Sequence, residues 1–380
     1  MYVGKAIAAA VLAATGIVAV ASTGSGAALR QRNAAGHVGS ATPAPAQTNA
    51  ELVRDEQLTV NTTKYKKSPP YTIGVIPQGP INGWGEMFNL TLQYTLKHSG
   101  KVRQILLENP EGTPNNQISE MQTMIVERPD AIILTPLSEA GLAGPVARAQ
   151  RAGIPVILCG SSVSNADWVT QGGRNLYQTA YNSATELAKM MGGKGNLMML
   201  NGIAGSTTAI TWNDAAHDAL KKFPKIHVVA DEYATWSISK SKTVASAIIS
   251  AHPKITGVWT GGSEGAIGTI EAFASSNRPM PIFGTTNPLN GFLALAKRYH
   301  IRFVADPYPP EMSQLCSNLA LKVLEGKPVK KYVDMLSLVK GSSQYTTAQL
   351  ATHYEPQYDT TFIGPAVIPA RYLKVFLVKK

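Results

Sequence analysis

A rhythm of short apolar segments, written twice along the chain, constrains the fold more than any other feature. The first set of segments begins near Thr72, Val102, Ala131 and Pro155. The second set begins near Asn196, Ile226, Gly257 and Pro281. The spacings are 30, 29 and 24 residues in the first set and 30, 31 and 24 in the second. A chain that repeats this pattern, including its shortened last step, is expected to contain two copies of one α/β unit.

The composition of the segments predicts what each copy looks like. Continuous apolar runs such as Ala131–Leu134 and Ile154–Leu158 alternate with amphipathic stretches, which is typical of parallel strands covered by helices on both faces. Each connection is then a right-handed crossover. The fold class is therefore α/β, with two doubly wound lobes, and one long doubly wound sheet is the alternative. Two similar lobes facing each other across a gap favour capture of a small molecule over catalysis.

The amino end predicts export. Met1–Lys5 carries one positive charge, Ala6–Ala21 is an apolar run, and small residues precede Ser22. This pattern indicates a signal peptide over residues 1–21, with no cysteine for a lipid anchor. A permanent membrane anchor is the weaker alternative, because the run is shorter than a bilayer span. Residues 22–68 are expected to form a flexible leader, since their composition offers little to bury. The expected location is the periplasm.

Charge and ligand-type residues exclude several functions. The net charge is +11, but the basic residues are spread along the chain and form no stripe with interleaved aromatic residues. Surface charge is therefore favoured over nucleic-acid binding. The seven histidines show no paired ligand spacing, so no metal or cofactor is expected. Of the two cysteines, Cys159 ends a predicted strand and Cys316 lies within a predicted helix. Two separate buried thiols are favoured over a disulfide.

Several ordered segments resemble a known family. They are Tyr71–Ile76, Asn82–Trp84, Asp130–Leu134, Ala152–Ile157 and Leu200–Ser206. From Tyr71 to about Val339 the chain resembles the type I periplasmic binding proteins of ABC transporters, in particular the ribose-binding "periplasmic binding protein 4" branch. The resemblance implies a monomer that binds a small-molecule ligand in a cleft between two Rossmann-like lobes and delivers it to a membrane ABC permease.

The resemblance also implies domain boundaries. Three hinge strands would cross between the lobes near 171–173, 306–307 and 331–332. The N-terminal lobe would comprise 71–171 plus 307–331, and the C-terminal lobe 172–306 plus 332–339. Residues 340–380 exceed the family core, and their aromatic and proline content suggests a segment packed along the surface.

Candidate ligand-binding residues follow the strands, because ligands of such sheets lie at the carboxyl ends of the strands. Carrying over the ribose-type site matches Asn82, Trp84 and Trp236. Elsewhere the family's charged or amide groups are replaced. Ser161 stands at the Asp-Arg pair, Trp212 at an arginine, Gly262 at an asparagine, Thr286 at an aspartate, and Asp306 on or beside a glutamine. Ribose is therefore not expected, and a ring-containing, less hydroxylated ligand fits the tryptophans better.

A sensor, an enzyme and a repressor are the alternative functions. A periplasmic sensor that serves a chemoreceptor or histidine kinase needs the same closing cleft, so the sequence does not separate it from a transport receptor. An enzyme would use carboxylates such as Glu86, Glu139, Glu264 and Asp306. Glu139 and Glu264, however, stand in the predicted first turns of helices, where the helix dipole favours a carboxylate for structural reasons. A repressor is excluded by the signal peptide and by the lack of a helix-turn-helix before Tyr71.

Overall fold

The computed structural model describes residues 49–79, 82–109, 111–165, 167–335, 345–346, 353–364, 366 and 368–378. The expected signal peptide, residues 1–21, lies outside the described residues, as do residues 22–48 of the expected leader and much of 336–352. Among the described residues, none of the helices has the length and apolar character needed to cross a bilayer.

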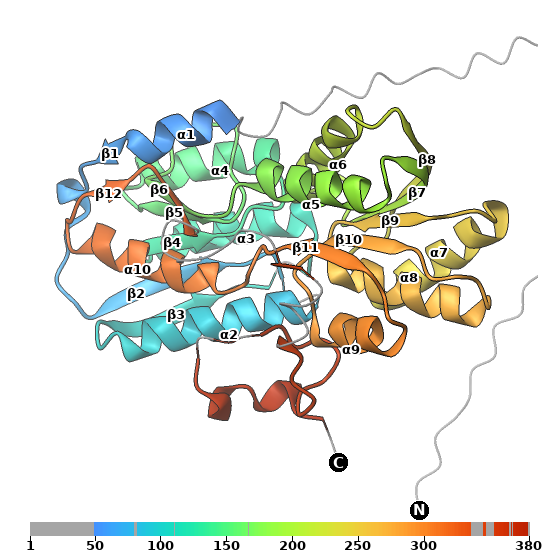
Figure 1. Ribbon diagram of the computed structural model, residues 1–380. Coiled ribbons are helices and arrows are strands. Elements are labelled where there is room, and N and C mark those ends of the chain that lie inside the picture. The colour runs from blue at the N-terminus through green and yellow to red at the C-terminus, as the bar shows by residue number, and fades with distance from the viewer. Residues whose placement is uncertain are drawn as a thin grey trace, which may run out of the picture. The chain divides into compact units, whose positions relative to one another are not determined.

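The first lobe is built on a six-stranded parallel sheet (Figure 1). Its strands, in sheet order, are β13 (Tyr332–Asp334), β6 (Thr170–Gly173), β5 (Val156–Cys159), β4 (Ala131–Leu134), β2 (Tyr71–Ile76) and β3 (Val102–Leu107). Its helices are α2 (Gly83–His98), α3 (Pro114–Glu127), α4 (Glu139–Arg151) and α10 (Met312–Leu324). Strands β2, β4, β5 and β6 are buried along their whole length. The apolar sequences of β2, β4 and β5 predict this burial, whereas β6 reads Thr-Gln-Gly-Gly and lies buried between β5 and β13.

The second lobe repeats this strand order, except that its last strand pairs antiparallel with its neighbour. Its sheet runs β14 (Tyr345–Thr346), β11 (Phe303–Asp306), β10 (Ile282–Thr286), β9 (Gly257–Thr260), β7 (Lys194–Asn201) and β8 (Lys225–Tyr233). Its helices are α5 (Leu176–Met190), α6 (Thr207–Leu220), α7 (Ile238–Ala251), α8 (Ser263–Ser275) and α9 (Asn290–Arg298). In each sheet the first strand of the lobe, β2 or β7, lies second from one edge. The strands that follow β3 or β8 are added in sequence toward the opposite edge, which β13 or β14 forms. The α/β prediction with two doubly wound lobes is confirmed.

Polar residues begin the helices at the carboxyl ends of the strands. Six caps accept a hydrogen bond from the backbone N–H three residues on, namely Asn82, Thr113, Ser138, Asn175, Ser206 and Ser237. Such a cap satisfies one of the free N–H groups of the first helical turn. The turns that lead from strand to helix are thereby fixed, and they are the turns that face the other lobe.

Two of the expected boundaries differ from the structure. Residues 172–173 and 332–334, which the prediction assigned to the C-terminal lobe, lie in β6 and β13 of the first lobe. Strand β13 pairs in parallel with β6 of the first lobe, Tyr332 lying beside Gln171. Residues 332–334 therefore belong to the N-terminal lobe, whereas the prediction assigned them to the C-terminal lobe. The last crossing accordingly follows Asp334. The first crossing passes through Arg174, between β6 and α5, and the second runs from Asp306 to Pro307.

The expected flexible leader is wrong for residues 49–68. Helix α1 (Asn49–Gln57) is followed by β1 (Thr59–Val60), which pairs antiparallel with β12 (Val329–Lys330), and by the 3-10 turn η1 (Thr63–Tyr65). The Tyr65 hydroxyl donates to Gln150 Oε1 at 2.7 Å, and its ring is buried. The composition argument failed because Leu52 and Tyr65 are buried against the first lobe, although Val53 and Leu58 remain exposed.

The preference for two separate thiols is also wrong. Cys159, at the end of β5, and Cys316, in the middle of α10, form a disulfide with their Cα atoms 5.8 Å apart. The two residues are 157 positions apart in the sequence. The strand end and the helix meet because α10 packs on β5 and β6 after the chain has returned from the second lobe.

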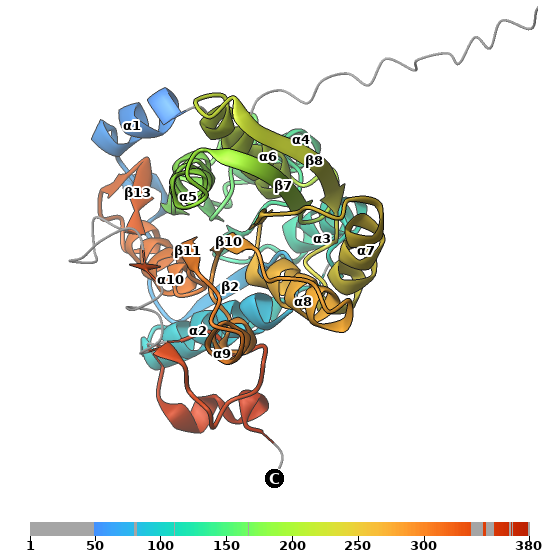
Figure 2. The same cartoon turned by 45° about the vertical axis from the view of Figure 1, so that its right-hand side comes forward.

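The described part of the C-terminal tail contacts both lobes (Figures 1 and 2). On the second lobe, the Asn290 side chain donates to the carbonyl oxygens of Glu355, Tyr358 and Asp359, and its oxygen accepts from the Glu355 N–H. The Asn290 and Gly291 backbone N–H groups donate to the tail carbonyls of residues 362 and 360. These bonds fix the tail to the amino end of α9.

On the first lobe, the tail lies along α2. The Tyr372 ring packs against Tyr94 and His98, with centroids 4.9 and 5.6 Å apart. A Cβ atom at Gly83 would lie 1.9 Å from the Thr361 carbonyl oxygen, so this approach requires glycine. Phe362 and Phe376 are buried in the same apolar cluster as Met87 of α2. The tail therefore spans the two lobes.

We predict that Asn290→Ala loosens this tail. Three carbonyls and one N–H lose their partner, and each buried unpaired group costs about 1–3 kcal/mol. The variant should show a lower unfolding midpoint in urea and faster proteolytic cleavage after residue 352. Asn116→Ala, on the exposed face of α3, is the matched control and should behave as wild type. Equal proteolysis of both variants would contradict the prediction.

Candidate functional site: a pocket between the lobes

A pocket of about 430 Å³ of space free of atoms, partly open to solvent, lies where the two lobes meet. Its described lining is Gln78, Gly79, Asn82, Trp84, Thr208, Trp212, Trp236, Gly261, Gly262, Glu264, Asn287 and Tyr308. These residues come from turns that follow β2, β7, β8, β9, β10 and β11. They lie at the carboxyl ends of the strands, which is the edge of each sheet where the sequence analysis expects a ligand.

The lobes touch each other beside this pocket. The Thr207 hydroxyl, in the first turn of α6, accepts the Glu139 N–H at 2.9 Å. The Thr207 N–H in turn donates to the Leu137 carbonyl, also at 2.9 Å. Because Thr207 belongs to the second lobe and the other two residues to the first, these bonds mark a closed arrangement.

The first lobe contributes two stacked rings. Trp84, in the first turn of α2, lies 5.8 Å from the Tyr308 ring at an interplanar angle of 17°, and its indole N–H donates to the Tyr308 carbonyl at 2.8 Å. The Asn287 side chain accepts the Tyr308 N–H at 2.6 Å. Asn287 itself has φ 47, an unusual backbone conformation that such bonding must hold. Tyr308 is thus fixed from both lobes.

The second lobe contributes Trp212 and Trp236. Their ring centroids lie 6.3 Å apart at an interplanar angle of 81°, and Trp212 meets Tyr308 edge-on at 5.4 Å. Trp236 has φ 50, rare for a bulky residue, and its indole N–H donates to the Gly261 carbonyl. A Cβ at Gly202 would lie 2.0 Å from the Trp236 ring. The turn over residues 202–205, which follows β7, therefore needs a glycine at its first position for this packing.

Trp84 and Trp236 thus line the same pocket from opposite lobes, as the sequence indicated. Their ring contacts, however, are with neighbours in their own lobe. Trp84 stacks on Phe88 and Tyr308, and Trp236 packs against Trp212.

Glu264 is the acidic residue among the described lining residues. Its side chain is buried, and its Oε1 atom has no hydrogen-bond partner in the part of the chain that the structure describes. Burial raises the pKa of this carboxyl from 4.5 to about 7. The Trp212 indole N–H is likewise buried and unpaired among the described residues. The pocket therefore presents one acceptor and one donor that the protein leaves unsatisfied.

Of the eight candidate residues, the structure brings Asn82, Trp84, Trp212, Trp236 and Gly262 to the pocket. It does not place Ser161, Thr286 or Asp306 among the lining residues. Ser161 turns its hydroxyl to the Pro136 carbonyl within the first lobe. Thr286 ends β10 and is fully buried, and the next residue, Asn287, reaches the pocket instead. The family carries charged or amide groups at these positions. Because this chain has replaced them, its sequence could not show which residue of each turn faces the pocket.

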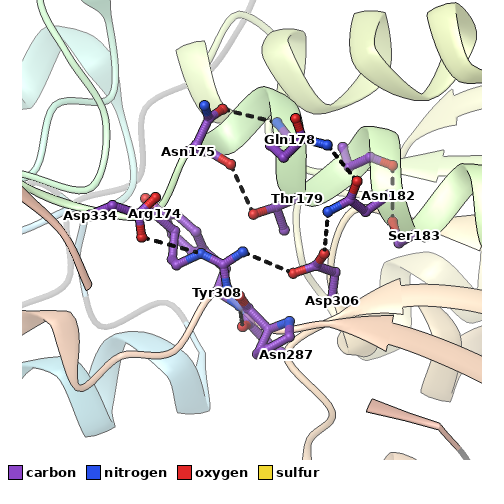
Figure 3. Close-up of polar contacts among 12 residues, drawn as sticks. Arg174, Asn175, Gln178, Thr179, Asn182, Ser183, Asn287, Asp306, Tyr308 and Asp334 are labelled. Carbon is purple, nitrogen blue, oxygen red and sulfur yellow. Dashed lines mark hydrogen bonds and ion pairs between the residues drawn. The ribbon is translucent and has the colours of Figure 1, made fainter. Parts of the chain in front are cut away.

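Asp306 serves the hinge, as Figure 3 shows. Its carboxylate accepts from Arg174 Nη2 at 3.1 Å and from Asn182 Nδ2 at 3.1 Å. Arg174 Nη1 donates to the Pro307 carbonyl at 2.8 Å, and Arg174 Nε lies 3.8 Å from Asp334 Oδ1. Burial raises the pKa of Asp306 to about 6, against the opposing effect of Arg174. One buried guanidinium on the first crossing thus contacts the second crossing and the last residue of β13.

Sequence reasoning missed Tyr308 and undervalued Glu264. Tyr308 lies two residues beyond β11, whose last residue, Asp306, is the last of the predicted candidates along the chain. Glu264 was interpreted as a first-turn carboxylate stabilised by its helix. Gly261 and Gly262 could have indicated that Glu264 lines the pocket, because they place no side chain between its carboxyl group and the cleft. Glu139, the other first-turn carboxylate, does not line the pocket. The described residues contain no cluster suited to a metal ion.

We predict that Arg174→Met lowers the free energy of unfolding by about 3–5 kcal/mol, because it leaves Asp306 buried without its cation. Adding Asp306→Asn should recover a large part of that loss. Urea unfolding at neutral pH measures both. Lys101→Met, which breaks the exposed pair with Glu325, is the control and should cost about 1 kcal/mol or less. A double variant as unstable as the single one would contradict the assignment.

A second prediction concerns pH. The folded pKa of Glu264 is raised, so the native state binds this proton more tightly than the unfolded chain does. The corresponding stability is present below about pH 4.5 and is lost as the pH rises through 7, a loss on the order of 3 kcal/mol. Between about pH 5 and pH 8, Glu264→Gln should therefore lose less stability than wild type. Parallel stability curves, measured by thermal unfolding of the free proteins, would contradict this.

The chain is similar to proteins of known function. The ribose import binding protein of Bacillus subtilis is 22% identical over 265 residues, covering 69% of this chain and 85% of the relative. The D-apiose import binding protein of Actinobacillus succinogenes is 28% identical over 174 residues, covering 46% of this chain and about half of the relative, 56%.

Among solved structures, the periplasmic component of an arabinose ABC transporter from Shewanella sp. ANA-3, bound to L-arabinofuranose, superposes with a TM-score of 0.68 at 18% identity. The match covers 74% of this chain and 94% of that one. At this identity it confirms the two-lobed fold. The sequence also matches, over residues 73–328, the family described as periplasmic binding protein domain. That match spans more than half of the chain, and the protein belongs to this family of binding proteins.

Proposed function

We propose that this chain is the periplasmic solute-binding component of an ABC importer and that its ligand is a small, polar, ring-containing compound of the sugar and polyol class. The observation that carries this proposal is the interlobe pocket, which gathers Trp84 and Tyr308 from one lobe and Trp212 and Trp236 from the other. Aromatic faces shared between two lobes suit a ring held between them. The relatives named above, two import binding proteins and an arabinose transporter component, support the ligand class.

The working step is closure. The three crossings would act as the hinge, and the bond between Thr207 and Glu139 would form when the lobes meet around ligand. A ligand that contacts both walls binds the closed form better than the open one, and this difference in affinity drives the population toward closure. We propose that the closed monomer is then recognised by the membrane permease. This function makes or breaks no covalent bond.

The proposal is tested by a panel of sugars, polyols and nucleosides in thermal unfolding of the mature protein, because a specific ligand raises stability by mass action. Small-angle scattering with and without a hit then reports whether the lobes close. A hit that leaves the radius of gyration unchanged would argue for a rigid binder. Failure of every compound in the panel would argue against the proposed ligand class.

The tryptophans give a sharper prediction. Trp84→Ala and Trp236→Ala should each weaken binding of a hit by about 1–3 kcal/mol, the range for truncation of a packed aromatic anchor. Both should also lose stability, since Trp84 bonds Tyr308 and Trp236 packs on Trp212. Trp168→Ala is the matched control, because this buried tryptophan lies in the first lobe and does not line the pocket.

Calorimetric titration at a temperature where all variants are folded measures these affinities. The control should lose stability and keep its affinity. If both pocket variants also keep wild-type affinity, their rings serve packing alone and the assignment of the site fails.

A further inference from the structure

The pocket leaves two buried polar atoms unsatisfied, and they are of opposite kinds. Glu264 Oε1 accepts hydrogen bonds, the Trp212 indole N–H donates one, and neither has a partner among the described residues. Glu264 is 5% exposed and Trp212 is 3% exposed. A buried polar group without a partner costs about 1–3 kcal/mol, so a site that keeps two of them is adapted to a ligand that pairs with both.

The charge of the lining is one-sided. Among the described lining residues there is a carboxyl group at Glu264 and no lysine, arginine or histidine. No charged side chain contributes to the shift of the Glu264 pKa, which comes from burial. Among the described lining residues, a carboxylate at Glu264 has no counterion. A ligand that brings a positive charge would supply it, whereas an anionic ligand would face repulsion at close range.

The rings around the carboxyl favour the same charge. Trp84, Trp212, Trp236 and Tyr308 all line the pocket, and a cation over the face of an indole or phenol ring is attracted by the ring's electron density. The position of Gly262 brings carboxyl and indole together. A Cβ there would lie 2.9 Å from Trp236 Cδ1 and 3.1 Å from Glu264 Oε2, so both groups border the space that a side chain would fill.

We propose that the ligand of this pocket is a hydroxylated ring bearing a protonated amine, the chemical class of the amino sugars. The Glu264 carboxylate binds the ammonium group, and the Trp212 N–H donates to an oxygen of the ring or of a hydroxyl group. The aromatic faces cover the remainder of the ring. This inference rests on the proposed function, and it specifies the ligand class that the proposed function leaves open.

The experiment compares matched sugars that differ at one position. D-Glucosamine is paired with D-glucose and D-galactosamine with D-galactose, and the N-acetyl forms add the same nitrogen without its charge. Binding to the full mature protein is measured by calorimetry at about pH 7. Each amine is expected to bind at least about ten-fold more tightly than its hydroxyl and N-acetyl counterparts.

Two variants assign the effect to the carboxyl. Glu264→Gln keeps the shape of the side chain and should abolish the preference for each amine over its neutral counterpart. Glu86→Gln is the matched control, since Glu86 is also a first-turn glutamate near the pocket but does not line it. It should keep the full preference.

The outcomes separate the two proposals. Neutral sugars that bind as well as the amines, or a preference for amines that survives in Glu264→Gln, would overturn the inference and leave the proposed function standing. If neither the charged nor the neutral members of the panel bind, the inference and the proposed sugar class are both wrong.

Discussion

The Arg174 guanidinium is the interaction on which the rest of the structure depends. It lies at the first crossing between the lobes, donates to the Asp306 carboxylate and the Pro307 carbonyl at the second, and lies 3.8 Å from Asp334 at the end of β13, before the third. Arg174 and Asp306 side chains are 2% and 0% exposed. Removing either partner would leave a charge buried without compensation, which is far more costly than losing a surface pair. The first crossing, the second crossing and the end of β13 are thereby held together.

The pocket inherits its geometry from this hinge. Tyr308 follows directly on Pro307, whose carbonyl Arg174 holds, and its own N–H is fixed by Asn287. Trp84 then stacks on Tyr308 and Trp212 meets it edge-on. The aromatic residues of both lobes are therefore positioned against one residue beside the hinge, Tyr308. A site whose rings are positioned in advance loses less conformational freedom when a ligand arrives.

The sequence predicted the fold well and the site in part, for physical reasons that can be named. The doubled spacing and the buried runs identified both sheets, because strands buried on two faces leave an apolar signature that nothing nearby obscures. Trp84, Trp212 and Trp236 were found because they follow strands. Tyr308 and Glu264 were missed or undervalued because their roles depend on which atoms lack partners, and periodicity carries no information about that.

Contacts between segments far apart in the sequence were also not predicted. The Cys159–Cys316 disulfide and the pairing of β1 with β12 join segments that meet after the chain has crossed between lobes twice. Asp306 was misassigned for a related reason. It lies at the carboxyl end of a strand, as a ligand-binding residue would, but its partners Arg174 and Asn182 are supplied by a segment more than a hundred residues earlier.

The tail that spans the lobes has a consequence for the rate at which such a protein works. It is joined to α9 by backbone and Asn290 hydrogen bonds, but to α2 mainly by apolar and ring contacts. If the lobes part, the contact with α2 would be the weaker of the two. Breaking it would expose Met87 and the tail's phenylalanines to water, at about 25 cal/mol per Å² of apolar surface. This free-energy cost would favour the closed state of the ligand-free protein. A receptor biased in this way admits its cargo slowly and holds it for long residence times, a trade that suits a scarce solute better than an abundant one.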